Sequence, residues 1–350
     1  MTYVKRRDAF KMLAVAGALA ISAVGMNSAS AAGSEDHYRF VMVSHIGSND
    51  PNMGWLTLSM KTFEEKYPGV KTEYVSTDQY SVQKHIQLLE QVIASKPDGI
   101  AVPIVDSKAF APVLNKAIAE GIPVVAFNIP DKSQGADKIP YLTYVGGDEY
   151  LTGVRLGEHA IEAAKAGKLP MPTSVLCANH DPAHQGLKAR CQGMTDAMAK
   201  INVKTEVLFI GADPAQARNT MQAYLSGHKD VNYIFCVAGW SSPWAYSVAD
   251  EMGLHPKIGD KGMTILTVDE SPVALEGIKE GKVFETNSQG FWLQGYVPME
   301  WLYWYKKYGY KPQSDILTGP VVIDASTVDH WETFVRSVFG AEYDKQAHVW

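Results

Sequence analysis

The sequence predicts an α/β fold built from two doubly wound parallel-sheet domains. The chain has 350 residues, more than one hydrophobic core ordinarily serves. Short apolar runs alternate with stretches of helical periodicity, and this rhythm starts again in the second half of the chain. An apolar content of 46% and a charged content of 20% are typical of a globular protein and not of a disordered or fibrous one.

A strand-helix-strand unit lies at the centre of the first half. Residues 100–105 and 122–127 are apolar without alternation, as expected for strands buried on both faces. The segment between them has helical periodicity and begins with Asp106 or Ser107 as a cap. Because ligands of such sheets bind beyond the carboxyl ends of the strands, Asp106 and Asn128 are predicted to lie near a site.

The remaining elements continue the alternation of strand and helix. In the first half we expect strands at residues 38–46, 70–75 and 141–145. Helices are expected to begin near residues 54, 82 and 148. In the second half we expect strands at residues 174–178, 203–210, 231–237 and 263–268. Helices are expected at residues 186–200, 214–226 and 245–252 and from Ser271-Pro272 onward. The aromatic-rich stretch 291–310 is expected to serve the core, and residues 316–323 to form one more strand.

The end of the chain differs from both halves, which suggests that the domains exchange their last elements. The chain would then cross between them three times, near Gly146-Gly147, Gln289-Gly290 and Gly319-Pro320, where glycine permits large backbone changes. This interpretation assigns residues 37–146 and 290–319 to an N-terminal lobe. Residues 147–289 and 320–350 then form a C-terminal lobe, and the three crossovers form a hinge.

The first residues have the features of a signal peptide. Four basic residues among the first eleven precede an apolar run at residues 12–24, which is too short to span a membrane. Ala29, Ser30 and Ala31 offer small residues for cleavage. We therefore predict a signal peptide over residues 1–31, cleavage near Ala31, and a periplasmic mature protein. Arg6-Arg7 leaves the general secretory and the twin-arginine pathways both open.

Charge and cysteine content narrow the possible partners. Removing the signal's charge of +3 from the total of −6 leaves about −9, and no basic cluster remains to bind nucleic acid. In an oxidising compartment Cys177 and Cys191 could pair across one strand-loop-helix turn, leaving Cys236 buried. Three reduced, buried thiols are the alternative.

The motifs of several enzyme and cofactor classes are missing from the sequence. It has no phosphate-binding glycine loop after a strand, no nucleophile elbow and no His-Glu-x-x-His. His180, Asp181 and His184 lie close together but lack metal-ligand spacing on one regular element. We therefore expect no cofactor, no metal and no catalytic activity.

Several stretches in this order, behind an export signal, resemble the periplasmic solute-binding proteins of sugar ABC transporters. The similarity is to the ribose-binding type (type I periplasmic binding proteins), which shares its fold with LacI-like regulator cores. The stretches are residues 95–100, 121–128, 145–150, 187–193 and 316–320. The resemblance covers nearly the whole mature chain and implies two lobes that close over a small solute.

The resemblance also implies positions for the ligand-binding residues. Asp50 and Pro51 match an Asp-Pro-aromatic-aromatic turn, with Trp55 near the second aromatic after two extra residues. Asn128 stands where ribose binders use Asp, and Ile129 where they use Arg. The other matching positions are Arg190, Asp269, the hinge residue Gln289, and Trp240, which replaces a family Asn. His180 is a further candidate outside this set.

These residue types suit a hydroxylated ring. Asp269, Asn128 and Gln289 can bond adjacent hydroxyls, Arg190 offers a planar fork, and tryptophans cover C–H faces. The prediction is an exported, monomeric receptor that captures a small neutral sugar or polyol and delivers it to an ABC permease in the inner membrane. A nucleoside or cyclic signalling molecule is the alternative ligand, and an exported α/β hydrolase is the alternative class. Each site residue also has a plain structural reading, as a cap, a turn, a hinge, a surface charge or core.

Overall fold

The computed structural model describes residues 37–48, 50, 52–77, 81–254 and 262–348. The predicted signal peptide, Asn49 and Pro51 lie outside these residues. Within them, no helix is both long and apolar enough to cross a membrane.

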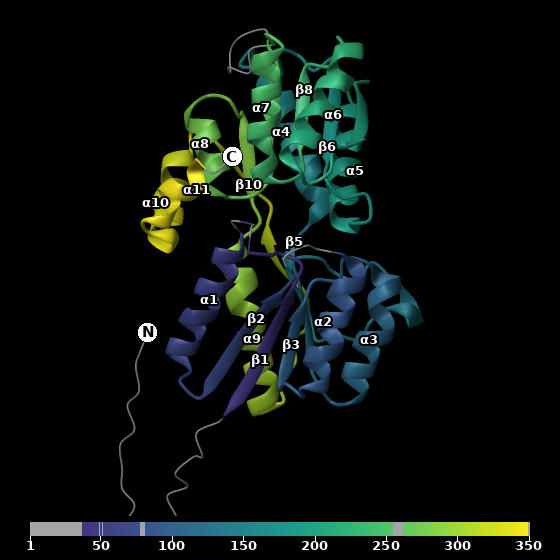
Figure 1. Cartoon of the computed structure of the whole chain (residues 1–350), viewed down its shortest axis with the longest axis vertical. Helices are drawn as coiled ribbons and strands as arrows, with labels where there is room; N and C mark the ends of the chain where they lie inside the picture. The colour runs from purple at the N-terminus through teal and green to yellow at the C-terminus, as the bar shows by residue number, and fades with distance from the viewer. Residues whose placement is uncertain (1–36, 49, 51, 78–80, 255–261, 349–350) are drawn as a thin grey trace, which may run out of the picture. The chain divides into compact units, whose positions relative to one another are not determined.

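The first sheet is entirely parallel and has the strand order β11-β5-β4-β3-β1-β2 (Figure 1). Its strands are β1 (Tyr38–Ser44), β2 (Val70–Ser76), β3 (Gly99–Val102), β4 (Val124–Phe127), β5 (Tyr144–Gly147) and β11 (Ile316–Gly319). Its helices are α1 (Met53–Lys66), α2 (Val82–Ala94), α3 (Ser107–Ala119) and α9 (Phe291–Tyr308). Phe40 and Met42 pack with α1 and α9, whereas Val41 and Val43 pack with α2 and α3, so the helices cover both faces. We call this unit the N-terminal lobe.

The second sheet has the order β12-β10-β9-β8-β6-β7 and is parallel except for the β10–β12 pair. Its strands are β6 (Ser174–Asn179), β7 (Lys204–Phe209), β8 (Tyr233–Cys236), β9 (Thr264–Leu266), β10 (Glu285–Ser288) and β12 (Val321–Asp324). Its helices are α4 (Glu149–Lys165), α5 (Gln185–Ala199), α6 (Pro214–Gly227), α7 (Ser242–Glu251) and α8 (Pro272–Lys279). Cores of buried side chains lie on both faces of this sheet as well, one against α4 and α5 and one against α6 to α8. This unit, with the helices that follow β12, is the C-terminal lobe.

The chain passes between the two sheets after β5, after β10 and between β11 and β12. The expectation of a single strand over residues 316–323 is therefore wrong. Pro320 follows a cis peptide bond and separates β11 in one sheet from β12 in the other. Proline has no N–H for a strand ladder, which explains why a continuous apolar pattern is broken at this residue.

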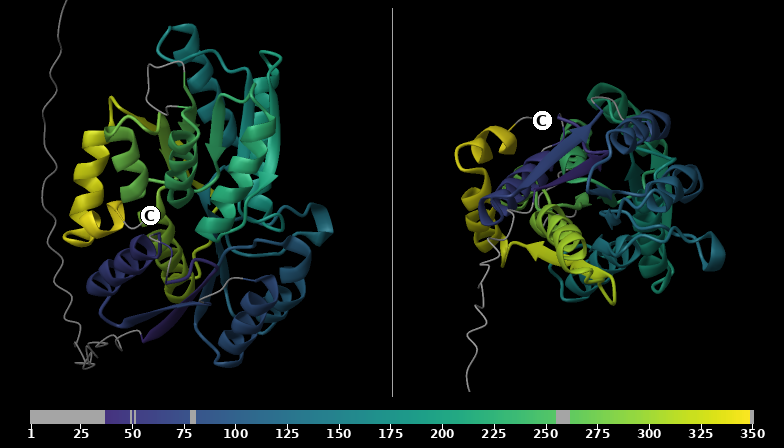
Figure 2. Two further views of the ribbon diagram at one scale, coloured as in Figure 1. Left: turned by 45° about the horizontal axis from the view of Figure 1, so that its top comes forward. Right: turned by 90° about the horizontal axis from the view of Figure 1, so that it is seen from below.

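Two helices follow β12 and contact both lobes. They are α10 (Val328–Phe339) and α11 (Glu342–Ala347). Both pack on α8, and α10 also contacts α1; Figure 2 shows this yellow segment beside the purple α1 and the green α8. The ring of Trp55 on α1 lies 5.6 Å from Phe334 and 4.8 Å from Phe339, measured between ring centroids. Neither helix was expected from the sequence.

Candidate functional site

A cavity of about 1150 Å³ lies where the strands of both sheets end. The N-terminal lobe contributes loops that follow β1, β2, β3 and β4, and the C-terminal lobe contributes loops that follow β6, β7, β8, β9 and β10. This is the position that the strand-end rule predicts for both lobes. Of the seven predicted ligand residues, six line it: Asp50, Asn128, Arg190, Trp240, Asp269 and Gln289.

Trp55 is the exception, because it does not line the cavity. Its side chain is 0% exposed and packs on Phe334 and Phe339 of α10. The ring is therefore a core contact between the lobes. Asn52 and Met53 are the two residues that this chain has in addition to the family pattern. Asn52 lines the cavity, whereas Trp55 does not.

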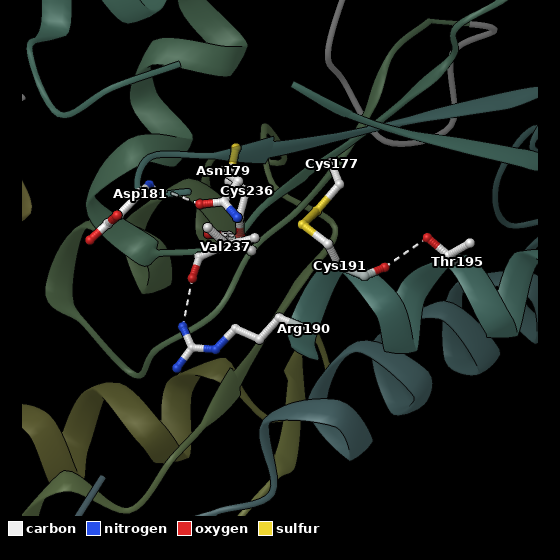
Figure 3. The surroundings of a disulfide bond; sticks show 9 residues. Cys177, Asn179, Asp181, Arg190, Cys191, Thr195, Cys236 and Val237 are labelled. Atoms are coloured by element: carbon white, nitrogen blue, oxygen red, sulfur yellow. Dashed lines mark hydrogen bonds between the residues drawn. A yellow bond between two sulfur atoms is a disulfide. The ribbon is translucent and has the colours of Figure 1, made fainter. Parts of the chain in front are cut away.

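Arg190 is held by three hydrogen-bond partners, of which Figure 3 shows Val237. It is 4% exposed, and its Nε donates to the carboxylate of Glu149 on α4. One terminal nitrogen donates to the backbone oxygen of Val237 at 2.6 Å, and the other to Oε1 of Gln289 at 2.9 Å. Although burial alone lowers the pKa of Arg190, the Glu149 carboxylate raises it overall, so the guanidinium stays charged.

Asp269 joins three segments at the floor of the cavity. Its Oδ2 accepts from Gly239 N at 3.3 Å and from Asn52 Nδ2 at 3.2 Å, and its Oδ1 accepts from Gln289 Nε2. The backbone φ of Asp269 is 85°, in the left-handed region. This conformation turns the chain in the segment that follows β9. The bond from Asn52 links the N-terminal lobe to the C-terminal lobe.

Asn128 has a comparable position in the N-terminal lobe. It is 3% exposed, with φ of 59°, and its Nδ2 donates to Gln294 Oε1 at 3.0 Å. Tyr144 Oη donates to its backbone oxygen at 2.6 Å. These contacts hold the left-handed turn that aims the side chain at the cavity.

Asp50 and Asn52 form the loop before α1. Asp50 Oδ1 accepts from the backbone N of Asn52 at 2.8 Å. Burial, with Asp269 nearby, raises the pKa of Asp50 to about 7. Asn52 is 3% exposed, and its Oδ1 has no hydrogen-bond partner in the part of the chain that the structure describes.

Trp240 supplies the apolar surface of the cavity. Its half-buried ring lies 4.7 Å from the ring of His180 and 5.0 Å from that of Trp244. An aromatic face of this kind can cover the C–H side of a sugar ring or stack on another flat ligand.

Three histidines were not in the predicted set, although each follows a strand end. His45 comes directly after β1, and His180 and His184 lie between β6 and α5. The rings of His45 and His184 meet across the lobes at 5.3 Å. Burial lowers the pKa of His45 and of His180 to about 3, and that of His184 well below its ordinary value, so all three are neutral at pH 7. The strand-end rule itself could have found them.

A disulfide anchors the helix that carries Arg190. Cys177 on β6 and Cys191 on α5 are bonded, with their Cα atoms 5.9 Å apart, and Arg190 directly precedes Cys191 (Figure 3). Cys236 is a buried free thiol on the neighbouring strand β8. Among the described residues, no group of three or more His, Cys, Asp or Glu could hold a metal ion.

Comparisons with known proteins agree with this architecture. The model of the periplasmic binding protein domain matches residues 46–309. The xylose/arabinose-binding protein XylF of Sulfolobus acidocaldarius is 27% identical over 252 residues, which cover 68% of this chain and 58% of that protein. The D-galactose/methyl-galactoside binding periplasmic protein MglB of Haemophilus influenzae is 26% identical over 199 residues, covering 53% of this chain and 57% of that protein.

Solved structures give the same result for the fold. A periplasmic sugar-binding protein of an ABC sugar transporter from Legionella pneumophila matches with a TM-score of 0.70 and 28% identity, covering 81% of this chain and 100% of that one. A carbohydrate transporter from Acidothermus cellulolyticus matches with a TM-score of 0.73 and 24% identity, covering 86% of this chain and 99% of that one. This chain belongs to the periplasmic binding protein family.

Proposed function

We propose that this protein is an exported receptor that binds a small sugar or polyol between its lobes and delivers it to an ABC permease. The observation that carries the proposal is the cavity, to which both lobes contribute hydrogen-bonding side chains and to which Trp240 contributes an aromatic face. The names of XylF, MglB and the Legionella protein support a sugar as the solute class. These relatives are named as binding proteins, which favours binding over catalysis.

Binding by closure explains why the site is divided between lobes. Asn52 donates to Asp269 across the cavity, and Gln185 Nε2 donates to the backbone oxygens of Ile104 and Pro130 from the opposite lobe. A solute that contacts both sides gains its full set of contacts only when the lobes meet, so it shifts the population toward the closed form.

The proposal keeps the expected boundaries and location. We assign residues 37–146 with 290–319 to one lobe and residues 147–289 with 320–350 to the other, and we take the three crossings between the sheets as the hinge. Residues 1–31 act as the signal peptide, cleaved near Ala31, and the mature protein works as a periplasmic monomer.

A thermal-shift screen of pentoses, hexoses, polyols and nucleosides tests the proposal. A bound sugar should raise the midpoint through mass action, by about 2.7 kcal/mol of stability at a hundredfold excess over Kd. A response to nucleosides alone would favour the second ligand class, in which Trp240 and His180 stack on a base. Turnover of a sugar substrate would overturn the binding role.

A further inference from the structure

One corner of the cavity gathers oxygen acceptors without a cation. Asp50, Asn52 and Asp269 meet there, joined by the contacts of Asn52 with both carboxylates. Within the described residues, no ion pair involves Asp50 or Asp269. The corner therefore has negative charge and lone pairs to offer.

Asn52 shows that the corner is incomplete. Its side chain is 97% buried, since its exposed fraction is 3%, and it lines the cavity. Its Nδ2 donates to Asp269, so the orientation of the amide is determined and Oδ1 is the free end. Among the described residues, that oxygen has no hydrogen-bond partner. A buried acceptor without a partner costs stability unless a ligand supplies a donor.

The charges of the rest of the cavity compensate the corner only in part, because Arg190 attracts Asp269 without forming an ion pair with it. Among the described lining residues, Arg190 is the one lysine or arginine, and it is already paired with Glu149. Five aspartates line the same cavity: Asp50, Asp106, Asp181, Asp213 and Asp269. Asp106 and Asp213 cap α3 and α6 through Ala109 N and Gln216 N, which accounts for their presence.

A neutral solute would satisfy the acceptors, but Asp50 would then either remain an unpaired carboxylate in a closed cavity or have to take up a proton. The dipole at the N-terminus of α1 stabilises a negative charge on Asp50. This stabilisation is smaller than the free-energy cost of burying an unpaired charge. An ammonium group supplies three N–H donors and the missing positive charge together.

We propose that Asp50, Asn52 and Asp269 form an ammonium subsite, and that the solute is an amino sugar or an aminocyclitol. The inference rests on the proposed function, because it places the amine on a ring held in the same cavity. Trp240 and Arg190 then contact the neutral part of that ring.

Isothermal titration calorimetry with matched ligands tests the subsite. The panel pairs glucose with glucosamine, galactose with galactosamine, and inositol with an aminoinositol. It also includes glucuronate and galacturonate, the two hexuronates of these hexoses, as anions. We expect at least one amine to bind at least about tenfold tighter than its neutral partner, the range for a hydrogen bond to a charged group. Neither hexuronate should bind.

Asp50→Asn should abolish the preference for the amine. Asp213→Asn is the matched control: it removes a lining carboxylate, but asparagine caps a helix as well as aspartate does, so the preference should remain. Calcium chloride titrated alone should give no heat; binding of calcium that Asp50→Asn removes would assign the corner to a metal and overturn the inference.

The remaining outcomes separate the two proposals. If a neutral sugar binds as tightly as its amine, or a hexuronate binds, the subsite is wrong and the receptor function stands. If no member of this panel and no sugar in the wider screen binds, the receptor function fails, and the subsite fails with it.

Discussion

Two polar corners of the same cavity, one around Arg190 and one around Asn52, differ in whether the protein supplies partners for their polar groups. Around Arg190, the guanidinium has partners in Glu149, Val237 and Gln289, all within the C-terminal lobe and hinge. Around Asn52, a buried oxygen and two carboxylates have no cation among the described residues. In the first corner (the framework corner) the protein itself supplies the hydrogen-bond partners of the charged group. In the second corner (the open corner) Oδ1 of Asn52 lacks a donor among the described residues. We propose that the first corner mainly holds the cavity together and that the second determines which ligand binds.

The largest effect is expected where the framework loses its buried charge. Arg190→Ala should lower the free energy of unfolding by about 3–5 kcal/mol, because Glu149 is left buried and unpaired. Urea unfolding measures this. The double variant Arg190→Ala/Glu149→Gln, which removes both charges, should recover part of the loss. An unchanged midpoint in the single variant would show that Arg190 serves the ligand alone.

Substituting Trp55 and Trp240 separates the effect of a core residue on stability from the effect of a cavity residue on ligand binding. Trp55→Ala should cost about 3–5 kcal/mol of stability, since a fully buried ring between α1 and α10 is lost. Trp240→Ala, the control, removes a half-buried ring and should weaken ligand binding about tenfold with a smaller cost in stability. Equal losses of stability for both variants would contradict the assignment of Trp240 to the site.

The disulfide stabilises the framework corner by constraining the unfolded chain. Cys177 and Cys191 are 14 residues apart, and a loop of this size corresponds to about 3 kcal/mol. The double variant Cys177→Ala/Cys191→Ala should unfold at a correspondingly lower urea concentration, while Cys236→Ala should show only the cost of a small cavity. Equal unfolding of the double variant and the wild type would show that the bond contributes nothing.

The open corner should respond to pH near neutrality. Because burial raises the pKa of Asp50 to about 7, lowering the pH from 8 to 6 protonates it and weakens its attraction for an ammonium group, by up to about tenfold per pH unit below the pKa. Asp269 and Tyr74 face Asp50, and the raised pKa of Tyr74 keeps that group neutral. His45 and His180, with pKa values of about 3, stay neutral throughout.

Calorimetry of the amine between pH 6 and 8 measures this dependence. Asp50→Asn should remove the part of the profile that belongs to the carboxylate and leave only the titration of the ligand's own amine. A profile that is the same in Asp50→Asn and in the wild type would remove Asp50 from the site.

Much of the architecture followed from local patterns. Buried strands and helical stripes are encoded by neighbours in the sequence, so the βαβ rhythm and the strand-end positions of Asn128 and Asp269 could be predicted. Trp55 could not be placed, because its burial depends on α10, nearly three hundred residues later in the chain. His45 and His184 belong to no motif, and only the meeting of the lobes brings their rings together.

The most direct test of a receptor that uses both lobes is calorimetry on one variant from each side. Asn128→Ala alters the N-terminal lobe and Trp240→Ala the C-terminal lobe, and the best ligand of the screen is titrated into both and into the wild type. We predict one ligand per chain and a weaker affinity in both variants. Binding that depends on one lobe alone, with the other variant matching the wild type, would contradict capture between the lobes.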